Sequence, residues 1–353
     1  MELRTRGKAI SLPAFFPDAT HGSIKGVGSD DLASIGVKTI VVNTYHLMKD
    51  NKIDIIRDAG GIHSFMGFNG AVISDSGGFQ VMSLIHDNPA NGKITDEKIE
   101  FKLANEHKKL TLTPETCIQT QISLGTDIIM CLDDCTNPEA PLEDQKLSVE
   151  RTIKWAKRCK DEYNLLTEGV VEKPLIFGII QGGNNKELRK KCAKGLIKIG
   201  FDGYAYGGWP VDGNREFLSE IVKYSAGLMP DNLPKYAMGV GKPENITECI
   251  EYGYNMFDCV LPSRDARHKR LYVFDDKAST NYHFIYLQSG KHADAFEPID
   301  TNCSCTTCRN YTKAYLWHLF KVNDPLCIRL ATVHNLRFYQ ELMERLVTAG
   351  VRS

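Results

Sequence analysis

The feature that most restricts how this chain can fold is a short apolar run that recurs eight times between helical stretches. Strands buried on both faces of a sheet are continuous apolar runs, and helices between such strands imply parallel β-α units. Eight units within roughly 250 residues are typical of a (β/α)8 barrel. The runs occupy residues 14–17, 39–42, 71–73, 127–132, 175–180, 203–206, 236–238 and 255–257.

Helix signals lie between these runs. Residues 29–31 and 113–115 have the composition of a helix cap and first turn, and Pro243 opens another helix. Residues 142–165 and 186–199 carry helix-forming charges at helical spacing. The competing architecture, an open doubly wound sheet, would need a phosphate-binding loop at its first βα turn, and no glycine-rich or Walker sequence stands there. We therefore predict an α/β protein built on a (β/α)8 TIM barrel.

The C-terminal ends of the predicted strands carry polar residues, and the active site of such a barrel lies at those ends. A single aspartate there is equally well explained as a helix cap or ion-pair partner, but several converging on one mouth suggest chemistry. Two carboxylates beside an acetal-like carbon suit glycosidic chemistry, one attacking or stabilising and the other moving a proton. The strand-end residues are Asp75, Asp133, Gln181, Gly208 and Asp258.

Other residues near these ends suit a planar, polar heterocycle. Gln181 and glycine backbone groups can form hydrogen bonds with its edge. Phe79 and Met238 can sandwich its faces, although a core role for either is equally compatible with the local sequence. The predicted site is therefore one that binds a heterocyclic base next to a pair of carboxylates.

Two segments interrupt the repeat. Residues 92–113 alternate apolar and polar positions around a polar turn at 105–107, which is typical of a β-hairpin. Residues from about 270 to 335 begin with a strand-like run at 271–274, and a final helix is expected from about 334 to 347. The predicted division is a catalytic barrel over 1–269, with the hairpin around 92–113, and a zinc-binding subdomain with the C-terminal helix over 270–353, packed on the barrel.

The second segment contains three cysteines within six residues, Cys303, Cys305 and Cys308, followed far downstream by His334. One tetrahedral Zn²⁺ held by three thiolates and an imidazole explains the cluster. The alternative is a disulfide beside an unpaired thiol, or chance crowding. Four protein ligands leave no open position for water, so we expect one structural Zn²⁺ per subunit, whose binding is coupled to folding.

Composition narrows the setting of the protein. The eleven cysteines are mostly scattered, which suits a reducing compartment better than a disulfide framework. The N-terminus lacks the apolar core of a signal peptide and no stretch approaches 18 apolar residues, so we expect a cytoplasmic protein without a membrane partner. A net charge of −1 argues against coating nucleic acid through the bulk field. A local basic run does exist at residues 264–270, although such runs are more often solvated surface.

Six further segments form a pattern that goes beyond these physical arguments. They are SDSGGFQV at 74–81, CLDDCT at 131–136, GIIQG at 178–182, GFDGYA at 200–205, MGVGKP at 238–243 and FDCVLP at 257–262. Together they resemble the signature of the queuine tRNA-ribosyltransferases, also called tRNA-guanine transglycosylases. The cysteine triplet with its distant His-Asn is similar to the zinc site of that family. The resemblance covers nearly the whole chain in the right order.

The resemblance implies a reaction. Guanine at the wobble position (34) of tRNAs with GUN anticodons would be exchanged for a 7-deazaguanine base, in queuosine modification. Asp258 would attack ribose C1′ and form a covalent enzyme–RNA intermediate, and Asp75 would manage protons as one base leaves and the next enters. The resemblance also implies a homodimer in which one subunit catalyses and the other helps to orient the RNA.

The resemblance also implies which residues bind the substrates. Asp133, Gln181 and Gly208 would hold the amide-like edge of the base, and Trp209 would offer its carbonyl to the substituent of the incoming base. Phe79 and Met238 would stack on the base, and Asp75 would also contact it. The basic run would contact the anticodon loop of the tRNA through Arg264, Arg267, Lys269 and Arg270.

Divergent loops leave the incoming base open. Bacterial members of the family use preQ1 and eukaryotic members use queuine; Cys135 and Val211 resemble the bacterial pocket, so preQ1 is expected and queuine is the alternative. Competing functions are a non-catalytic tRNA-binding accessory subunit, a relative that inserts deazaguanine into DNA, and a plain glycoside hydrolase. An accessory subunit would lack the nucleophile or base-binding residues, and a hydrolase would leave the zinc segment and the arginines without a role.

Overall fold

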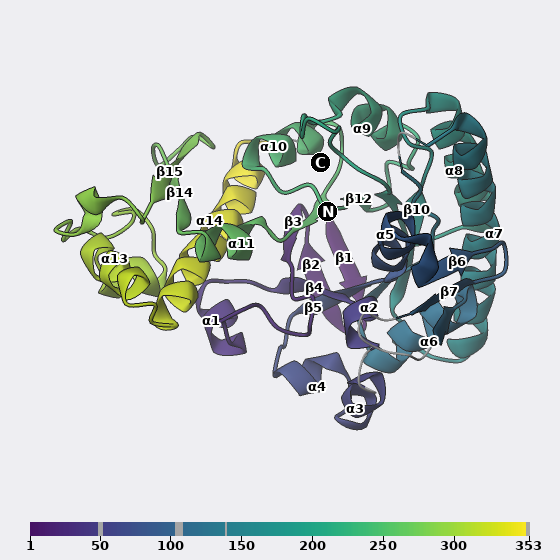
Figure 1. Ribbon diagram of the computed structural model, residues 1–353, viewed down its shortest axis with the longest axis horizontal. Coiled ribbons are helices and arrows are strands. Elements are labelled where there is room, and N and C mark those ends of the chain that lie inside the picture. Colours follow the sequence, from purple (N-terminus) through teal and green to yellow (C-terminus); the bar gives the residue numbers. More distant parts are fainter. Residues whose placement is uncertain (49–51, 103–108, 138–139, 351–353) are drawn as a thin grey trace.

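The chain folds around eight parallel strands that curl into a nearly closed barrel, as the sequence predicts (Figure 1). The computed structural model describes residues 1–48, 52–102, 109–137 and 140–350. The barrel strands are β3 (Ala14–Pro17), β4 (Thr39–Asn43), β5 (Ala71–Asp75), β9 (Ile128–Met130), β10 (Leu175–Ile180), β11 (Gly203–Tyr206), β12 (Lys235–Ala237) and β13 (Met256–Cys259). Their order in the sheet is β3-β13-β12-β11-β10-β9-β5-β4. A parallel bridge between Asp18 and Val41 brings the two ends of this order together.

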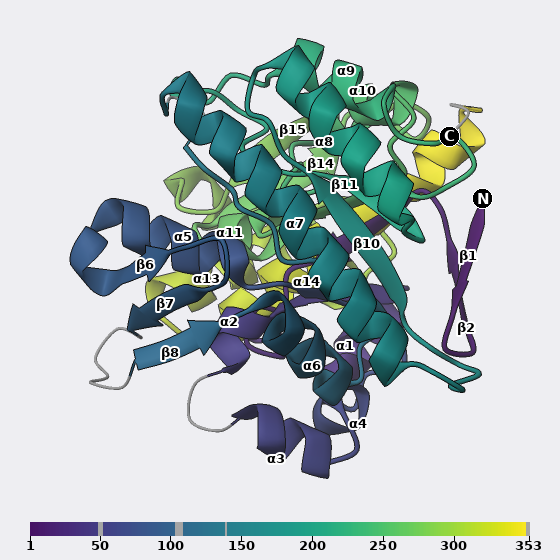
Figure 2. The same ribbon diagram turned by 90° about the vertical axis from the view of Figure 1, so that its right-hand side faces the viewer.

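Helices cover the outside of the barrel, and the two longest of this layer, α7 and α8, pack side by side (Figure 2). The predicted proline signals are confirmed, because Pro114 and Pro243 stand in first helical turns. The cap predicted at Ser29 is wrong by one residue: Gly28 is the N-cap, and its N–H donates to the Asp31 carboxylate at 3.2 Å. The helices are α1 (Ser29–Ser34), α2 (Thr44–Leu47), α3 (Lys52–Asp58), α4 (Ile62–Met66), α5 (Gly78–Asp87), α6 (Pro114–Leu124), α7 (Leu142–Leu166), α8 (Lys186–Ile199), α9 (Ser219–Ala226), α10 (Pro243–Glu251) and α11 (Leu261–Arg267).

Alternation along the strands divides their side chains between the barrel interior and the helix layer. Phe16, Ile73 and Met256 belong to the apolar cluster that fills the interior. Their sequence neighbours on the same strands pack instead in the clusters beneath the helices. Because side chains of a strand alternate with a period of two, this pattern also decides which strand-end residues face the barrel mouth.

A hairpin of β1 (Glu2–Thr5) and β2 (Lys8–Ser11) lies at the N-terminal ends of the barrel strands. Lys8 Nζ donates to the Asp127 carboxylate at 3.0 Å, and His63 Nε2 lies 2.8 Å from the same oxygen. The N–H of Val72 also donates to that carboxylate at 2.8 Å. Asp127 therefore binds the β1–β2 hairpin to the N-terminal end of the barrel. The strand expected over 127–132 is shorter at both ends.

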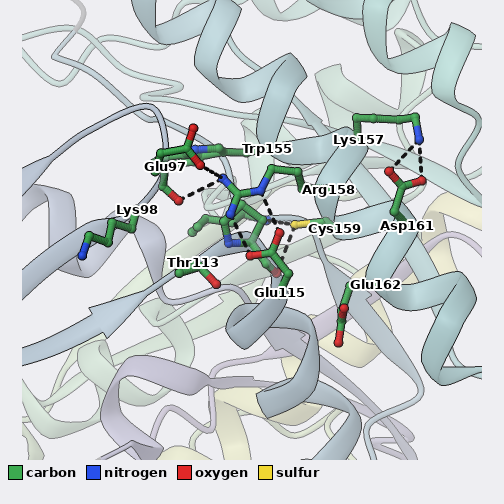
Figure 3. A network of polar contacts seen from close by, with 12 residues as sticks. Glu97, Lys98, Thr113, Glu115, Trp155, Lys157, Arg158, Cys159, Asp161 and Glu162 are labelled. Atoms are coloured by element: carbon green, nitrogen blue, oxygen red, sulfur yellow. Dashed lines mark hydrogen bonds and ion pairs between the residues drawn. The ribbon is translucent and has the colours of Figure 1, made fainter.

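The first insertion is a three-stranded antiparallel sheet of β6 (Gly92–Ile94), β7 (Ile99–Lys102) and β8 (Lys109–Leu112), with a 3-10 turn at Pro89–Asn91 before it. The expected hairpin is thus confirmed as β7–β8, with β6 as an additional strand; its turn at 105–107 lies outside the described residues. Arg158 of α7 anchors the insertion (Figure 3). Its guanidinium donates to both carboxylate oxygens of Glu115, at 2.7 and 2.8 Å, and to the carbonyl of Glu97 at 2.9 Å.

The second insertion contains the hairpin of β14 (Arg270–Phe274) and β15 (Tyr282–Tyr286), a 3-10 turn at Gly290–His292, and the helices α12 (Thr306–Asn310), α13 (Lys313–Lys321) and α14 (Leu326–Thr348). Helix α14 starts at Leu326, earlier than the predicted start near 334. Pro325 precedes its first turn, and His334 lies inside the helix with its side chain turned inward. His334 thus lies on the buried face of α14, and the helix begins two turns before it.

The C-terminal segment is joined to the barrel by apolar packing. One buried cluster contains barrel residues such as Ile40 and Val42 together with Leu316 and Leu336 of the last two helices. Helix α14 also contacts α11, β14 and β3. In Figure 1 it stands between the barrel and the β14–α13 region. The division of the chain at residue 269 stays a prediction.

Within the described residues, no helix combines the length and the apolar character needed to cross a membrane.

Candidate active site and metal centre

The mouth of the barrel brings together the predicted carboxylates. Asp75 and Asp258 lie two residues beyond Ile73 and Met256, which fill the interior, so the strand alternation turns both carboxylates toward the mouth. Each is half-buried. The charge of Asp258 contributes to the raised pKa of Asp75, which places the two carboxylates close enough to influence each other.

Asp258 is held by two donors. Its Oδ1 accepts a hydrogen bond from the hydroxyl of Tyr236 at 2.7 Å and from the N–H of Gly239 at 2.8 Å. Burial raises the pKa of Asp258 to about 6, and these two donors partly offset that effect because they favour the charged form. At neutral pH the carboxylate is therefore mostly ionised and fixed in direction, as a nucleophile must be.

Asp75 is held by a donor on the neighbouring strand β4. Its Oδ2 accepts a hydrogen bond from Asn43 Nδ2 at 2.9 Å, and Asn43 faces Asp75 directly in the register of β4 and β5. Burial, followed by the charge of Asp258, raises the pKa of Asp75 to about 6. A carboxylate with this pKa can both take up and release a proton near neutral pH.

Asp133 and Gln181 form the next part of the mouth, and both are buried. Gln181 Nε2 donates to Asp133 Oδ2 at 2.6 Å. Burial raises the pKa of Asp133 to about 7, while the hydrogen bond from Gln181 works in the opposite direction. The pair offers carboxylate and amide oxygens side by side, which suits the N–H groups along the edge of a purine-like base.

A buried arginine supports the loops that carry Gln181 and Gly208. Arg189 of α8 donates from Nη1 to the carbonyls of Ile180 at 2.6 Å and Gly207 at 2.8 Å, and from Nε to the carbonyl of Gly183 at 2.9 Å. Its guanidinium also stacks 4.2 Å from the ring centre of Tyr206. One cation therefore fixes the chain after β10 to the chain after β11.

Glycine is required where these loops meet. A Cβ atom on Gly207 would lie 2.5 Å from Gln181 Nε2, so any larger residue would displace the amide. Gly208 has a φ of +97°, which side chains rarely permit. The contact between Gly208 and a base stays a prediction.

Two aromatic residues form the outer wall of the site. The rings of Phe79 and Trp209 meet edge to face, with centres 5.3 Å apart. They border a cavity of about 320 Å³ that is also lined by Cys135 and Val211. The carbonyl of Trp209 accepts a hydrogen bond from the hydroxyl of Tyr206 at 3.2 Å, and its second lone pair is available to a ligand. Met238 lies at the end of β12, half-buried against the interior cluster.

The predicted RNA-contacting residues do not share one environment. Arg264 is exposed, and Arg267 follows it by one helical turn on α11. Arg270 instead pairs with the buried Asp265 at 2.7 Å and lies over the ring of Phe284. This geometry fits a structural role for Arg270 better than an RNA contact.

The four predicted metal ligands come together. The ligand atoms of Cys303, Cys305, Cys308 and His334 all lie within 4.8 Å of one another. His334 Nε2 lies 2.8 Å from the carbonyl of Tyr272; since a carbonyl only accepts, Nε2 carries the proton and Nδ1 faces the thiols. All eleven cysteines are free, so the disulfide alternative is wrong. The cluster can hold one metal ion.

Three residues that support the site, Tyr236, Arg189 and Asn43, could not be assigned from the sequence, and Asp18 had no expected role. Tyr236 lies within an apolar run, so in the sequence it resembles a core residue. Arg189 lies within a lysine-rich helix, so it resembles a residue of the solvated surface. Asn43 and Asp18 do follow apolar runs, and strand-end position was the available signal for both. Only the structure shows that Asn43 donates to Asp75 and that Tyr236 donates to Asp258.

Comparisons with known proteins match nearly the whole chain to one family. A family model described as "Queuine tRNA-ribosyltransferase" matches residues 1–349. A protein named queuine tRNA-ribosyltransferase from Mannheimia succiniciproducens is 40% identical over 341 residues, which are 97% of this chain and 86% of the relative. Proteins of the same name are 39% identical in Actinobacillus pleuropneumoniae (97% of this chain, 86% of the relative) and 41% identical in Haemophilus influenzae (95% and 84%).

Proposed function

Because this chain belongs to the queuine tRNA-ribosyltransferase family, we propose that it exchanges guanine for a 7-deazaguanine base at wobble position 34 of tRNAs with GUN anticodons, as a tRNA-guanine transglycosylase in queuosine modification. The single observation that carries this proposal is the pair of half-buried carboxylates, Asp75 and Asp258, at the same barrel mouth as the hydrogen-bonded pair of Asp133 and Gln181. A non-catalytic accessory subunit has no use for this arrangement.

The proposed reaction consists of two displacements at one carbon. The carboxylate of Asp258 forms a bond to ribose C1′ as the bond from C1′ to guanine N9 breaks, and Asp75 protonates the departing base. The incoming base then gives its N9 proton to Asp75, attacks C1′ and releases Asp258. Each displacement inverts C1′, so the product keeps the original configuration.

The substrate is expected to be a single-stranded loop of RNA. The base must leave its stack before C1′ can reach Asp258, and unstacking is least costly outside a duplex. We expect Arg264 and Arg267 to contact the anticodon loop, because both lie on the helix that follows Asp258. Lys269 comes just after that helix, and its φ of +64° marks a tight turn there.

We propose preQ1 as the incoming base and keep queuine as the alternative. Cys135 and Val211 line the cavity beside Trp209, where the substituent of the base would lie. The larger ring of queuine would have to fit between them. We also propose a homodimer, which the family resemblance implies, and a cytoplasmic location, which the scattered cysteines favour.

We also propose that the metal is a structural Zn²⁺. Three thiolates and one imidazole nitrogen are the donors that tetrahedral Zn²⁺ prefers, and they fill its coordination shell. The ion would tie α12 to α14, since Cys305 and Cys308 flank the start of α12 and His334 lies within α14.

One assay tests the activity and the base together. A tRNA with a GUN anticodon that carries labelled guanine at position 34 is incubated with the protein and guanine, preQ1 or queuine in parallel. We expect release of label with guanine and with preQ1, and none with the Asp258→Ala variant. Absence of release with every base would refute the proposed activity, whereas release with queuine alone would refute only the choice of base.

A further inference from the structure

A third carboxylate, Asp18, shares the barrel mouth with Asp75 and Asp258. It follows β3, two residues beyond the interior residue Phe16, so the same strand alternation turns it toward the mouth. Its backbone still pairs with the barrel, through the bridge to Val41. Its charge also contributes to the raised pKa of both other carboxylates, as expected for neighbours.

The order of strands divides the mouth into two halves. Most residues that we assign to the base, namely Asp133, Gln181, Gly208, Trp209 and Met238, follow four adjacent strands, β9, β10, β11 and β12. Asp75 and Phe79 follow β5, which borders this half. The other four strands are also adjacent, and in the order β13, β3, β4 and β5 they carry Asp258, Asp18, Asn43 and Asp75. If the base occupies the first half and C1′ lies at Asp258, the sugar must extend over the second half. Asp18 stands in that half, directly beside the strand of the nucleophile.

The surroundings of Asp18 leave it able to accept a further hydrogen bond. Thr20 Oγ1 donates to its Oδ1 at 2.5 Å. Among the described residues no cation lies within ion-pair distance of it, and its electrostatic support comes from His21 and Arg267 farther away. Burial raises the pKa of Asp18, because it disfavours the ionised form of the carboxyl group. A carboxylate can accept about four hydrogen bonds. The hydroxyl and the N–H of Thr20 both donate to Asp18, so acceptor capacity remains for a ligand.

We propose that Asp18 accepts a hydrogen bond from the 2′-hydroxyl of the nucleotide whose base is exchanged, and that it thereby selects ribose over deoxyribose at that position. This inference rests on the proposed function. Within an RNA chain the 3′ oxygen belongs to a phosphodiester, so the 2′-hydroxyl is the only free donor of the sugar. The 2′-hydroxyl is also the group by which a protein distinguishes RNA from DNA at a given nucleotide.

The test uses two RNA hairpins with a GUN anticodon loop that differ only at the target nucleotide, guanosine in one and 2′-deoxyguanosine in the other. The measured quantity is kcat/KM for guanine exchange. A hydrogen bond to a charged acceptor corresponds to a factor of about 10 to 100. We expect the unaltered protein to prefer the ribose hairpin by about that factor. We expect Asp18→Ala to lose the preference by slowing only the ribose hairpin, and Asp18→Asn, which keeps an acceptor oxygen, to fall between the two.

The ratio between the hairpins distinguishes sugar recognition from a general defect. If Asp18→Ala leaves the ratio of the two kcat/KM values unchanged, whether or not both values fall, the inference is overturned. The matched control is Asp31→Ala, which removes a carboxylate that pairs with Arg329 outside the mouth and should leave both rates unchanged.

The same hairpins separate this inference from the proposed function. If the unaltered protein exchanges no guanine in either hairpin, the proposed function fails, and equilibrium binding of the two hairpins then decides on Asp18. Tighter binding of the ribose hairpin that disappears in Asp18→Ala supports the inference. Equal binding of the two hairpins by the unaltered protein contradicts it.

Discussion

The hydroxyl of Tyr236 offers the sharpest test of how the protein sets the charge of its nucleophile. Tyr236 is buried inside the barrel, and its hydroxyl donates to Asp258 Oδ1 at 2.7 Å. The Tyr236→Phe variant removes that donor and keeps the ring. The ionised form of Asp258 loses a hydrogen bond, whereas the protonated form loses little. The pKa of Asp258 should therefore rise further above its present value of about 6.

The structure sets the size of this effect. A hydrogen bond to a charged group contributes about 1.5–3 kcal/mol, and 1.36 kcal/mol corresponds to one pKa unit. The N–H of Gly239 still donates to Asp258 at 2.8 Å, and the carboxylate is only half-buried, so the lower end of the range applies. We expect the acid limb of the pH profile to move upward by about one pH unit.

The assay is the pH dependence of kcat/KM for guanine exchange between about pH 5 and pH 9, a range that includes carboxylates with raised pKa values. Exchange requires ionised Asp258, so activity rises with pH through its pKa. Asp75 is coupled to Asp258, and the limb therefore reports on the pair. Activity of Tyr236→Phe should be reduced most at acidic pH and should approach that of the unaltered protein at alkaline pH.

Tyr254→Phe is the matched control. Tyr254 is also fully buried, and its hydroxyl donates to a backbone carbonyl, that of Val222, at 3.0 Å. This variant should lose stability comparable to that of Tyr236→Phe and keep the original pH profile. An acid limb that stays in place in Tyr236→Phe, or moves equally in both variants, would refute the reasoning.

Three further predictions concern the supports of the site and the fold. Arg189→Met should raise KM for the free base more than KM for RNA, by about tenfold, because the loops that hold the base lose their shared cation; equal changes in the two constants would contradict this role. Cys305→Ala should release the metal and lower the melting temperature, whereas Cys249→Ala, at a buried thiol remote from the metal ligands, should retain the metal; metal content and thermal unfolding measure both. Asp127→Ala should destabilise the protein by about 3 kcal/mol in urea unfolding, because Lys8, His63 and the N–H of Val72 lose their acceptor, and a change below about 1 kcal/mol would show that this cluster is not important.

The pH dependence of the Asp127 contribution follows from the sign of its pKa shift. Burial opposes ionisation, but the hydrogen bonds and charge of His63, with Val72 and Lys8, hold the pKa of Asp127 below its usual 3.8. A carboxylate whose pKa is lowered by folding stabilises the protein above its unfolded pKa, and this stabilisation is lost as the pH falls through the folded pKa. The difference in unfolding free energy between the unaltered protein and Asp127→Ala should thus be constant above about pH 5 and shrink in acid.

The barrel could be predicted because its signals are local. Each apolar run is short and bounded by helix caps, and a polar residue such as Asp75 or Asp258 follows it. The geometry of parallel strands then brings those residues to one mouth without further information. The metal ligands were predictable for a similar reason, since three thiols stand within six residues.

The contacts that tune these residues could not be predicted, because they join distant segments through residues with ordinary local roles. Tyr236 stands 22 positions from Asp258 and looks like part of a buried strand. Arg189 is surrounded by exposed lysines, and only the packing of α8 against the barrel shows that it is buried. The start of α14 was placed too late for a related reason: His334 marks the metal-binding face of the helix, whereas Pro325 marks its beginning.

In the proposed reaction, Asp258 becomes covalently joined to the RNA during base exchange. The most direct measurement incubates the protein with a GUN-anticodon hairpin, denatures the mixture, and looks for a protein–RNA adduct by gel electrophoresis and by mass spectrometry of the peptide that contains Asp258. We predict an adduct on Asp258 that disappears when guanine is added in excess, and no adduct in Asp258→Asn. Rapid guanine exchange without any adduct, or an adduct on another residue, would show that Asp258 is not the nucleophile.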